Sequence, residues 1–282
     1  MVSDLCSVGM AQHESDLRVP RALSIAGSDS GGGAGIQADL KAFARCGVHG
    51  MTAITAITAQ NTVEVRAVYP LPPDAIVAQI AAVADDIGVD AVKIGMLGNT
   101  QTIEAVAEGL DLLPGVPVVL DPVMVAESGA TLLEESAQVA LREQLLPRVT
   151  VVTPNLPEAR VLARAEDDMP PEELARAVHA LGPQNVVVTG GHRDEAIDLF
   201  FDGRELVEIP GERYPDGAAH GSGCTHSSAL AAHLALGFEP LEAAQRAKVI
   251  AAEAVAAGMR SVGAGAGPVD VFDLTARAAV RG

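Results

Sequence analysis

The stretch AGSDSGGGAGIQAD, residues 26–39, decides the fold class. It follows a short apolar run, residues 22–26, and opens a helix expected over residues 34–46, in which Ile36, Leu40 and Phe43 share one face. Glycines between a strand and a helix let backbone N–H groups approach a ligand closely, and the positive end of the helix favours an anion or a polar group. We therefore predict a strand–turn–helix unit that binds a ligand. A flexible connecting loop is the alternative.

This glycine-rich stretch differs from two familiar phosphate-binding sequences. No Gly-Lys-Ser/Thr follows it, so it is not a Walker A loop. No clear ribose-binding acid comes after the next strand, as a dinucleotide fingerprint requires. Asp39 lies on the first turns of the expected helix, where it could point at a ligand or only favour the helix N-terminus electrostatically.

Strands and helices alternate along the rest of the chain. Strands are expected at residues 22–26, 52–59, 91–94, 116–120, 150–153 and 186–189, and helices at 34–46, 74–87, 100–112, 136–146, 156–165, 171–181, 224–236 and 240–257. Several strands are apolar throughout, which is typical of strands buried on both faces of a parallel sheet. Residues 196–201 and 205–209 flank Asp202-Gly203 and predict a hairpin near the end of the sheet.

These elements predict a single α/β domain over residues 21–282, a three-layer α/β/α sandwich with a mostly parallel central sheet. A polar lead-in, residues 1–20, is expected to be disordered. The chain has 282 residues, 49% of them apolar, and a formal net charge of −18. Such a charge repels nucleic-acid phosphates and anionic lipids, so neither nucleic acid nor membrane is an expected partner.

The cellular compartment is predicted from the lack of apolar spans and from the small number of cysteines. No segment approaches the roughly 18 apolar residues of a membrane span, and no signal-peptide pattern opens the chain. The three cysteines, Cys6, Cys46 and Cys224, are too sparse for a disulfide framework or a zinc site. A reducing, cytoplasmic location is therefore expected.

Polar or methionine-rich segments follow several expected strands. TAQNT (58–62), KIGML (93–97) and LDPVM (120–124) end or follow strands, as the glycine-rich stretch does. Ligands of open α/β sheets bind outside the carboxyl ends of the strands, so these segments are predicted to surround one site. Amides such as that of Gln60 bond well to heterocycles, but they also form ordinary turns.

TPNLPE, residues 153–158, places Asn155 and Glu158 three residues apart at the start of a helix, where both face one way. Their oxygens suit a hard cation such as Mg²⁺, held directly or through water. The alternative is a variant of the capping box, in which the two residues only cap the helix.

AHGSGCT, residues 219–225, precedes another expected helix. Its backbone amides could form an anion hole at the positive end of the helix dipole. A cysteine at this place, Cys224, is expected to have a lowered pKa and more thiolate character. A small buried residue at a tight turn is the alternative.

Taken together, seven segments in order resemble one family over residues 21–270: AGSDSGGGAGIQADLKAF, AITAQNT, KIGML, LDPVM, TPNLPEA, GGH (190–192) and HGSGCT. They resemble the bacterial hydroxymethylpyrimidine/phosphomethylpyrimidine kinases of thiamine biosynthesis, within the ribokinase-like superfamily. The resemblance implies ATP-dependent phosphorylation of 4-amino-5-hydroxymethyl-2-methylpyrimidine and then of its monophosphate to the diphosphate. It also implies Mg²⁺ as cofactor and a homodimer.

The resemblance implies roles for residues as well. Those that would contact the pyrimidine are Asp39 and Gln60, as hydrogen-bonding groups, with Gly27, Ala34, Met96 and Val123 as the rest of the pocket. Those that would face the nucleotide phosphates are Asp121, Asn155, Thr189 and Gly191. Asn155 and Glu158 would organise Mg²⁺, through water. Gly221, Ser222 and Gly223 would form the anion hole, and Cys224 stands where the superfamily usually has a catalytic aspartate, so it is the expected base.

The sequence departs from the family pattern at three places. Thr189 and Glu127 stand where lysines are frequent, and Ala218-Ala219 replace Asn-Thr. The whole chain has three lysines, Lys41, Lys93 and Lys248, so phosphate charge must be met by Mg²⁺, helix amides or an arginine. Two alternatives remain open: a pyridoxal or pyridoxine kinase, and a non-catalytic vitamer-binding regulatory module.

Overall fold

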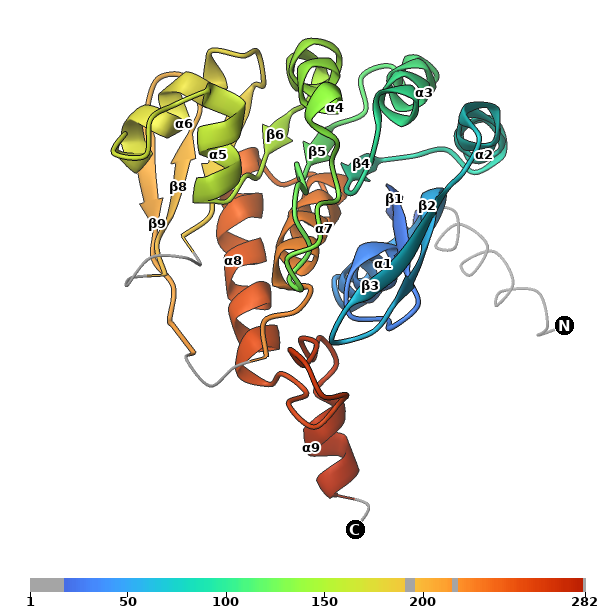
Figure 1. The fold of residues 1–282 in the computed structure, drawn as a ribbon, viewed down its shortest axis with the longest axis vertical. Helices are drawn as coiled ribbons and strands as arrows, with labels where there is room; N and C mark the ends of the chain where they lie inside the picture. The colour runs from blue at the N-terminus through green and yellow to red at the C-terminus, as the bar shows by residue number, and fades with distance from the viewer. Residues whose placement is uncertain (1–17, 191–195, 215–217, 281–282) are drawn as a thin grey trace, which may run out of the picture.

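The computed structural model describes residues 18–190, 196–214 and 218–280 (Figure 1). Its strands form one nine-stranded sheet within these residues, in the order β3-β2-β1-β4-β5-β6-β7-β8-β9. The strands are β1 (Arg21–Asp29), β2 (His49–Gln60), β3 (Val65–Pro70), β4 (Ala91–Ile94), β5 (Val118–Leu120), β6 (Val151–Val152), β7 (Asn185–Val188), β8 (Asp198–Phe201) and β9 (Leu206–Ile209). The strands from β2 to β7 pair in parallel, while β3, β8 and β9 are antiparallel to their neighbours.

Helices cover both faces of the sheet, as Figure 1 shows. One apolar core lies under α2 (Pro73–Asp86), α3 (Thr100–Asp111), α4 (Glu135–Ala140), α5 (Leu156–Ala163) and α6 (Pro171–His179). A second core, on the opposite face, lies under α1 (Gly35–Arg45), α7 (Ser222–Ala235) and α8 (Pro240–Ala256). A short helix, α9 (Leu274–Ala279), ends the described chain. The predicted three-layer α/β/α architecture is confirmed.

The strand order reverses at β1. The chain runs from β1 to β2 and β3 on one side, and then crosses to β4 on the other side. Such a reversal leaves a crevice outside the carboxyl ends of the strands, because the connections leave in opposite directions. The sheet topology therefore places a binding site where the glycine-rich turn after β1 and the segment after β4 meet.

The predicted elements differ from the structure in a few places. The hairpin over residues 196–201 and 205–209 is confirmed as β8 and β9. Strand β3 was not predicted, because most of its side chains are exposed and its sequence carries no burial pattern. The single helix expected over residues 136–146 is wrong in its second half: after α4 the chain makes a π-helical turn (Leu141–Leu145) and a 3₁₀ turn (Leu146–Arg148) that contains Pro147. Most of the predicted lead-in, residues 1–17, lies outside the described residues.

None of the helices in the described ranges combines the length and the apolar character that crossing a membrane requires.

A buried ion pair joins four elements below the end of β1. The Nζ of Lys93 in β4 lies 2.8 Å from Oδ1 of Asp39 in α1, and both side chains are fully inaccessible to water. The Ser24 hydroxyl of β1 donates to Oδ2 of Asp39 at 2.6 Å, and the Ser228 hydroxyl of α7 donates to Oδ1 at 2.7 Å. One carboxylate thus holds two strands and two helices together.

Removing the cation from this pair should strongly destabilise the fold. We expect Lys93→Met to lower the free energy of unfolding by about 3–5 kcal/mol, because it leaves the Asp39 carboxylate buried without its counter-charge. Urea denaturation followed by circular dichroism measures the change. The matched control is Arg66→Met, which breaks an exposed pair with Glu64 and should cost no more than about 1 kcal/mol. Equal small losses in both variants would contradict the assigned role.

Candidate active site

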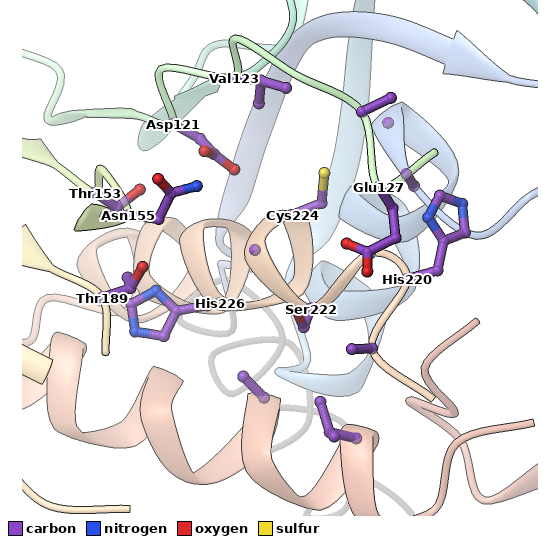
Figure 2. Close-up of a pocket in the computed structure, with 18 of the residues that line it drawn as sticks. Asp121, Val123, Glu127, Thr153, Asn155, Thr189, His220, Ser222, Cys224 and His226 are labelled. Atoms are coloured by element: carbon purple, nitrogen blue, oxygen red, sulfur yellow. The ribbon is translucent and has the colours of Figure 1, made fainter. Parts of the chain in front are cut away.

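A cavity of about 480 Å³ opens at the carboxyl ends of the central strands. Its walls come from the turn after β1, the ends of β2 and β4, the segment after β5, the start of α5 and the N-terminal turns of α7. Figure 2 shows labelled side chains of the segment after β5, of the start of α5 and of α7 around this space. Segments far apart in the sequence therefore meet at one site, as the strand ends predicted.

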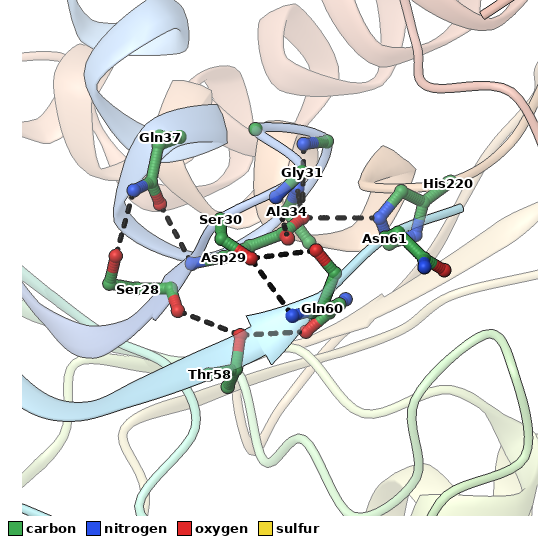
Figure 3. A network of polar contacts seen from close by, with 12 residues as sticks. Ser28, Asp29, Ser30, Gly31, Ala34, Gln37, Thr58, Gln60, Asn61 and His220 are labelled. Atoms are coloured by element: carbon green, nitrogen blue, oxygen red, sulfur yellow. Dashed lines mark hydrogen bonds and ion pairs between the residues drawn. The ribbon is translucent and has the colours of Figure 1, made fainter. Parts of the chain in front are cut away.

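The glycine-rich turn after β1 is organised by Asp29. Its carboxylate accepts hydrogen bonds from the backbone N–H groups of Gly31 (2.7 Å), Gly33 (3.0 Å) and Ala34 (2.8 Å), as Figure 3 shows in part. Nε2 of His220 lies 3.3 Å from the same carboxylate. Burial alone would raise the pKa of Asp29, but the hydrogen bonds from His220 and from the loop amides outweigh burial and hold this pKa below its ordinary value. Asp29 therefore fixes the conformation of this loop.

The two glycine-rich segments of the sequence pack directly against each other. Gly221 has φ +84°, and a Cβ there would lie 1.8 Å from the carbonyl oxygen of Gly33. A Cβ on Gly33 would in turn lie 2.2 Å from the His220 ring. Only glycine fits at both contacts, so the N-terminus of α7 can approach the turn after β1.

One part of the cavity wall is formed by predicted pyrimidine-binding residues. The structure brings together Gly27, Ala34, Gln60, Met96 and Val123. Oε1 of Gln60 accepts a hydrogen bond from the Thr58 hydroxyl at 3.1 Å (Figure 3). The same hydroxyl lies 2.9 Å from the carbonyl oxygen of Ser28. The contact with Thr58 fixes the amide and leaves its NH₂ group to donate elsewhere. We call this part, defined by these five residues, the pyrimidine half of the cavity.

Asp39 does not belong to that wall. Its side chain is fully buried, and its oxygens are bonded to Lys93, Ser24 and Ser228. The Asp39 carboxylate is therefore not available in this arrangement to accept the predicted hydrogen bond from a ligand. Lys93, which the sequence analysis did not assign to the site, borders the cavity instead, although water does not reach its side chain. Asp39 and Lys93 both stand in the motifs that the sequence analysis singled out. Their pairing depends on a contact between α1 and β4 that spacing along the sequence does not reveal.

Gly221, Ser222 and Gly223, the residues expected to form an anion hole, lie at the start of α7, where the Ser222 N–H already bonds to the Ala219 carbonyl oxygen at 2.9 Å. Gly221 caps this helix, and the backbone N–H groups of Gly223 and Cys224 have no acceptor among the described residues. Ser222, Gly223 and Cys224 all border the cavity. Unpaired N–H groups at the positive end of a helix are suited to phosphate oxygens.

The expected lowering of the Cys224 pKa is wrong. Burial is the main cause that raises the pKa of this thiol to about 12, and the negative charges of Asp39 and Asp121 act in the same direction. The Lys93 ammonium and the Gly35 N–H lower it, but by less. The helix terminus alone suggested a thiolate, whereas in the structure burial, assisted by the charges of Asp39 and Asp121, favours the protonated thiol.

Asn155 and Glu158 form the capping box and also face the cavity. The Asn155 side chain accepts from the Glu158 N–H, and the Glu158 carboxylate accepts from the Asn155 N–H, each at 2.9 Å. Burial and the nearby negative charge of Asp121 raise the pKa of Glu158 to about 8. Burial likewise raises the pKa of Asp121, although Lys93 and the Ser227 hydroxyl partly offset it. Two carboxyl groups short of positive charge at one wall suit a hard cation. The described residues contain no cluster of three or more His, Cys, Asp or Glu side chains that could hold a metal without further ligands.

The remaining predicted residues lie toward β7, α7 and α8. Thr189 borders the cavity and pairs with the Asn155 backbone, and exposed Glu127 reaches the cavity from the segment after β5 (Figure 2). Gly191 lies outside the described residues. Ala219 borders the cavity, whereas Ala218 is buried beside Gly258.

Sequence reasoning also missed further polar residues of the cavity wall, among them Asp29, His226, Asp198 and Lys248. Asp29 stood inside the quoted stretch and His226 directly follows the last motif, so both were within reach of the sequence. Asp198 and Lys248 carry no motif signal, because they come from β8 and α8 and meet only in the fold.

Comparison with known proteins agrees with this geometry. The family model for phosphomethylpyrimidine kinase matches residues 29–270. The chain belongs to the phosphomethylpyrimidine kinase family. Among members of this family, the hydroxymethylpyrimidine/phosphomethylpyrimidine kinase of Rhizobium meliloti (strain 1021) is 50% identical over 257 residues, covering 89% of this chain and 96% of the relative. The enzyme of the same name from Bacillus subtilis (strain 168) is 43% identical over 263 residues, covering 91% and 96%.

The fold of this chain is similar to solved structures of a phosphomethylpyrimidine kinase and of pyridoxal kinases. Phosphomethylpyrimidine kinase from Clostridium difficile 630 superposes with a TM-score of 0.73 at 41% identity, covering 84% of this chain and all of that one. An ADP complex of Bacillus subtilis pyridoxal kinase gives a TM-score of 0.83 at 40% identity, covering 92% and 99%.

The raised pKa of Glu158 predicts a pH-dependent stability. Its ordinary pKa is 4.5, so between pH 4.5 and about 8 the folded chain keeps a proton that the unfolded chain releases. The contribution of this group to the free energy of unfolding therefore falls as pH rises through that window. Urea denaturation in EDTA should show wild type losing stability relative to Glu158→Gln between pH 5 and pH 8. A gap that is the same at both pH values would refute the assignment.

Proposed function

We propose that this chain is an ATP-dependent kinase that phosphorylates 4-amino-5-hydroxymethyl-2-methylpyrimidine and then its monophosphate, in thiamine diphosphate biosynthesis. One observation carries the proposal: the pyrimidine half of the cavity and the unpaired amides at the start of α7 border the same space. The names of the relatives supply the substrate class. Phosphoryl transfer requires that an acceptor and a phosphoryl group be held together with charge stabilisation, and these two features provide both parts.

The anion hole is assigned to the transferred phosphoryl group. The N–H groups of Gly223 and Cys224 lie at the N-terminus of a 14-residue helix, where the dipole favours negative charge. Because these donors are fixed before the reaction, they stabilise charge that develops on the phosphoryl oxygens without reorganisation. Gly33 and Gly221 support this role, since their close contact holds the hole beside the pyrimidine half.

Mg²⁺ is proposed as the cofactor, held at the wall formed by Asp121, Asn155 and Glu158. The raised pKa values of the two carboxyl groups mark a place where positive charge is missing. When bound, the ion neutralises phosphate charge. Asn155 and Glu158 bond to each other, so we assign them a water-mediated rather than a direct contact.

Cys224 is proposed to act differently in the two transfers. In the first, the hydroxymethyl group must lose a proton, and Cys224 is a titratable side chain at the anion hole. Its raised pKa makes it a poor acceptor until further positive charge is bound nearby. In the second transfer the acceptor is a phosphate oxygen, which is largely ionised near neutral pH and needs no base.

Pyridoxal is the second candidate substrate. The pyridoxal kinase structure superposes with a higher TM-score than the phosphomethylpyrimidine kinase structure, 0.83 against 0.73. Its coverage of this chain is also higher, however, and the two sequence identities are nearly equal. We favour the pyrimidine because the relatives at 43–50% identity carry its name.

We also propose a homodimer and a cytoplasmic location. The homodimer is supported by two large exposed side chains, Ile57 of β2 and Tyr69 of β3, at the β3 edge of the sheet. The cytoplasmic location is supported by Cys46 and Cys224, which are both free thiols.

An activity assay tests the proposed reaction. Purified chain with ATP and Mg²⁺ should convert the pyrimidine alcohol to its mono- and diphosphate, followed by mass spectrometry. Its monophosphate and pyridoxal are run in parallel. Faster turnover of pyridoxal would favour the second candidate. Binding of the pyrimidine by folded protein without turnover of any substrate would favour a non-catalytic regulatory module.

The proton-acceptor role predicts that Cys224→Ala separates the two steps. Turnover of the alcohol should fall about 100-fold or more, the usual size of a general-base contribution, while turnover of the monophosphate falls less. Each substrate is assayed alone at saturating ATP, and pyrimidine affinity is measured by calorimetry. Equal losses in both steps would remove Cys224 from proton transfer and leave it a positioning role.

A further inference from the structure

His226 lines the cavity but has no role in the mechanism described so far. It lies on α7 four residues after Ser222, so it faces the same side of the helix one turn deeper than the anion hole. Only 5% of the residue is exposed. Figure 2 shows its ring beyond the anion hole on the side of Thr189, away from Val123 of the pyrimidine half.

Neither ring nitrogen of His226 has a hydrogen-bond partner among the described residues. Two other buried histidines differ in this respect. Nδ1 of His233, on the same helix, lies 2.7 Å from the Ala229 carbonyl oxygen, and Nε2 of His220 lies 3.3 Å from Asp29. A buried polar group without a partner is unfavourable, so such groups point to a ligand when they border a cavity. Thr225, whose hydroxyl is also unpartnered, does not border it.

Asp198 and Lys248 complete the surroundings of this ring. Nε2 of His226 is 3.5 Å from Oδ2 of Asp198 and forms no hydrogen bond with it. Oδ1 of Asp198 accepts from Nζ of Lys248 at 2.6 Å and from the Gly190 N–H at 2.8 Å. The Gly190 contact anchors the group beside Thr189, at the end of β7. A donor and a cation thus stand together on the α7–α8 side of a cavity otherwise rich in carboxylates.

We infer that His226 is a nucleotide-binding residue whose imidazole N–H donates to the polyphosphate of ATP. The inference rests on the proposed kinase function and assigns one group that meets the phosphate charge. The amides of Gly223 and Cys224 lie at the N-terminal end of α7, and His226 lies one turn further along this helix. A phosphate chain held by these amides is therefore close to the His226 ring. Thr189, which lies beside this group, offers a hydroxyl and no charge. Asp198 acts as a positioning residue for the cation, because its carboxylate bonds to the Lys248 ammonium on the side of the cavity where the imidazole lies.

Calorimetric titration of the full chain with ATP, ADP, AMP and adenosine tests this assignment. We expect His226→Leu to weaken ATP and ADP binding about tenfold or more, the size of a lost hydrogen bond to a charged group, and to leave adenosine binding unchanged. His226→Gln, which keeps an N–H donor, should recover most of the ATP affinity. His233→Leu is the matched control: it removes a buried histidine from the same helix and should not change nucleotide affinity.

Different results separate this inference from the proposed function. Absence of nucleotide binding by the wild-type chain would overturn both. Normal ATP binding by His226→Leu, or an equal loss for ATP and adenosine, would overturn the role of His226 and leave the kinase assignment intact. If the leucine variant does not fold, His226→Phe keeps a ring without nitrogens and is judged by the same outcomes.

Discussion

The ion pair between Lys93 and Asp39 is the interaction on which the rest of the site depends. It lies where β1, β4, α1 and α7 converge, and the hydroxyls of Ser24 and Ser228 complete its hydrogen bonding. Charges this deeply buried are tolerated only when paired and fully bonded, so the pair favours one mutual arrangement of these elements. The same four elements carry the glycine-rich turn, the Met96 segment and the anion hole. Positioning of the cavity walls therefore follows from a contact that no ligand needs to touch.

The pair also sets the electrostatics of the cavity. Lys93 is shared among Asp39, Asp121 and Cys224, and it does not fully offset the burial of the last two, whose pKa values are raised. Glu158 is raised for a related reason, because burial and Asp121 act together. The unliganded site thus lacks positive charge at the wall of Asp121 and Glu158. That is consistent with a protein whose substrates arrive with a metal ion, since the ion supplies what the chain omits.

Much of the fold was predictable from the sequence, and the site only in part. Apolar strands, helix faces and the turn at Asp202-Gly203 specify local structure, so the parallel sheet and the β8–β9 hairpin were expected correctly. Strand β3 was missed because an exposed edge strand needs no apolar pattern. Residues on motifs, such as Gln60 and Met96, were found where strand ends meet. The pairing of Asp39 with Lys93 and the raised pKa of Cys224 were not, because both result from contacts between segments distant in sequence.

A crystal structure of the chain with the pyrimidine alcohol and a non-hydrolysable ATP analogue tests the account most directly. The account predicts the pyrimidine against Gly27, Gln60 and Met96, its hydroxymethyl oxygen toward Cys224, and the Lys93–Asp39 pair intact beneath it. An Asp39 carboxylate turned to the pyrimidine ring, with Lys93 released toward the phosphates, would contradict the account. In that case the buried pair would be a resting state of the site and not its foundation.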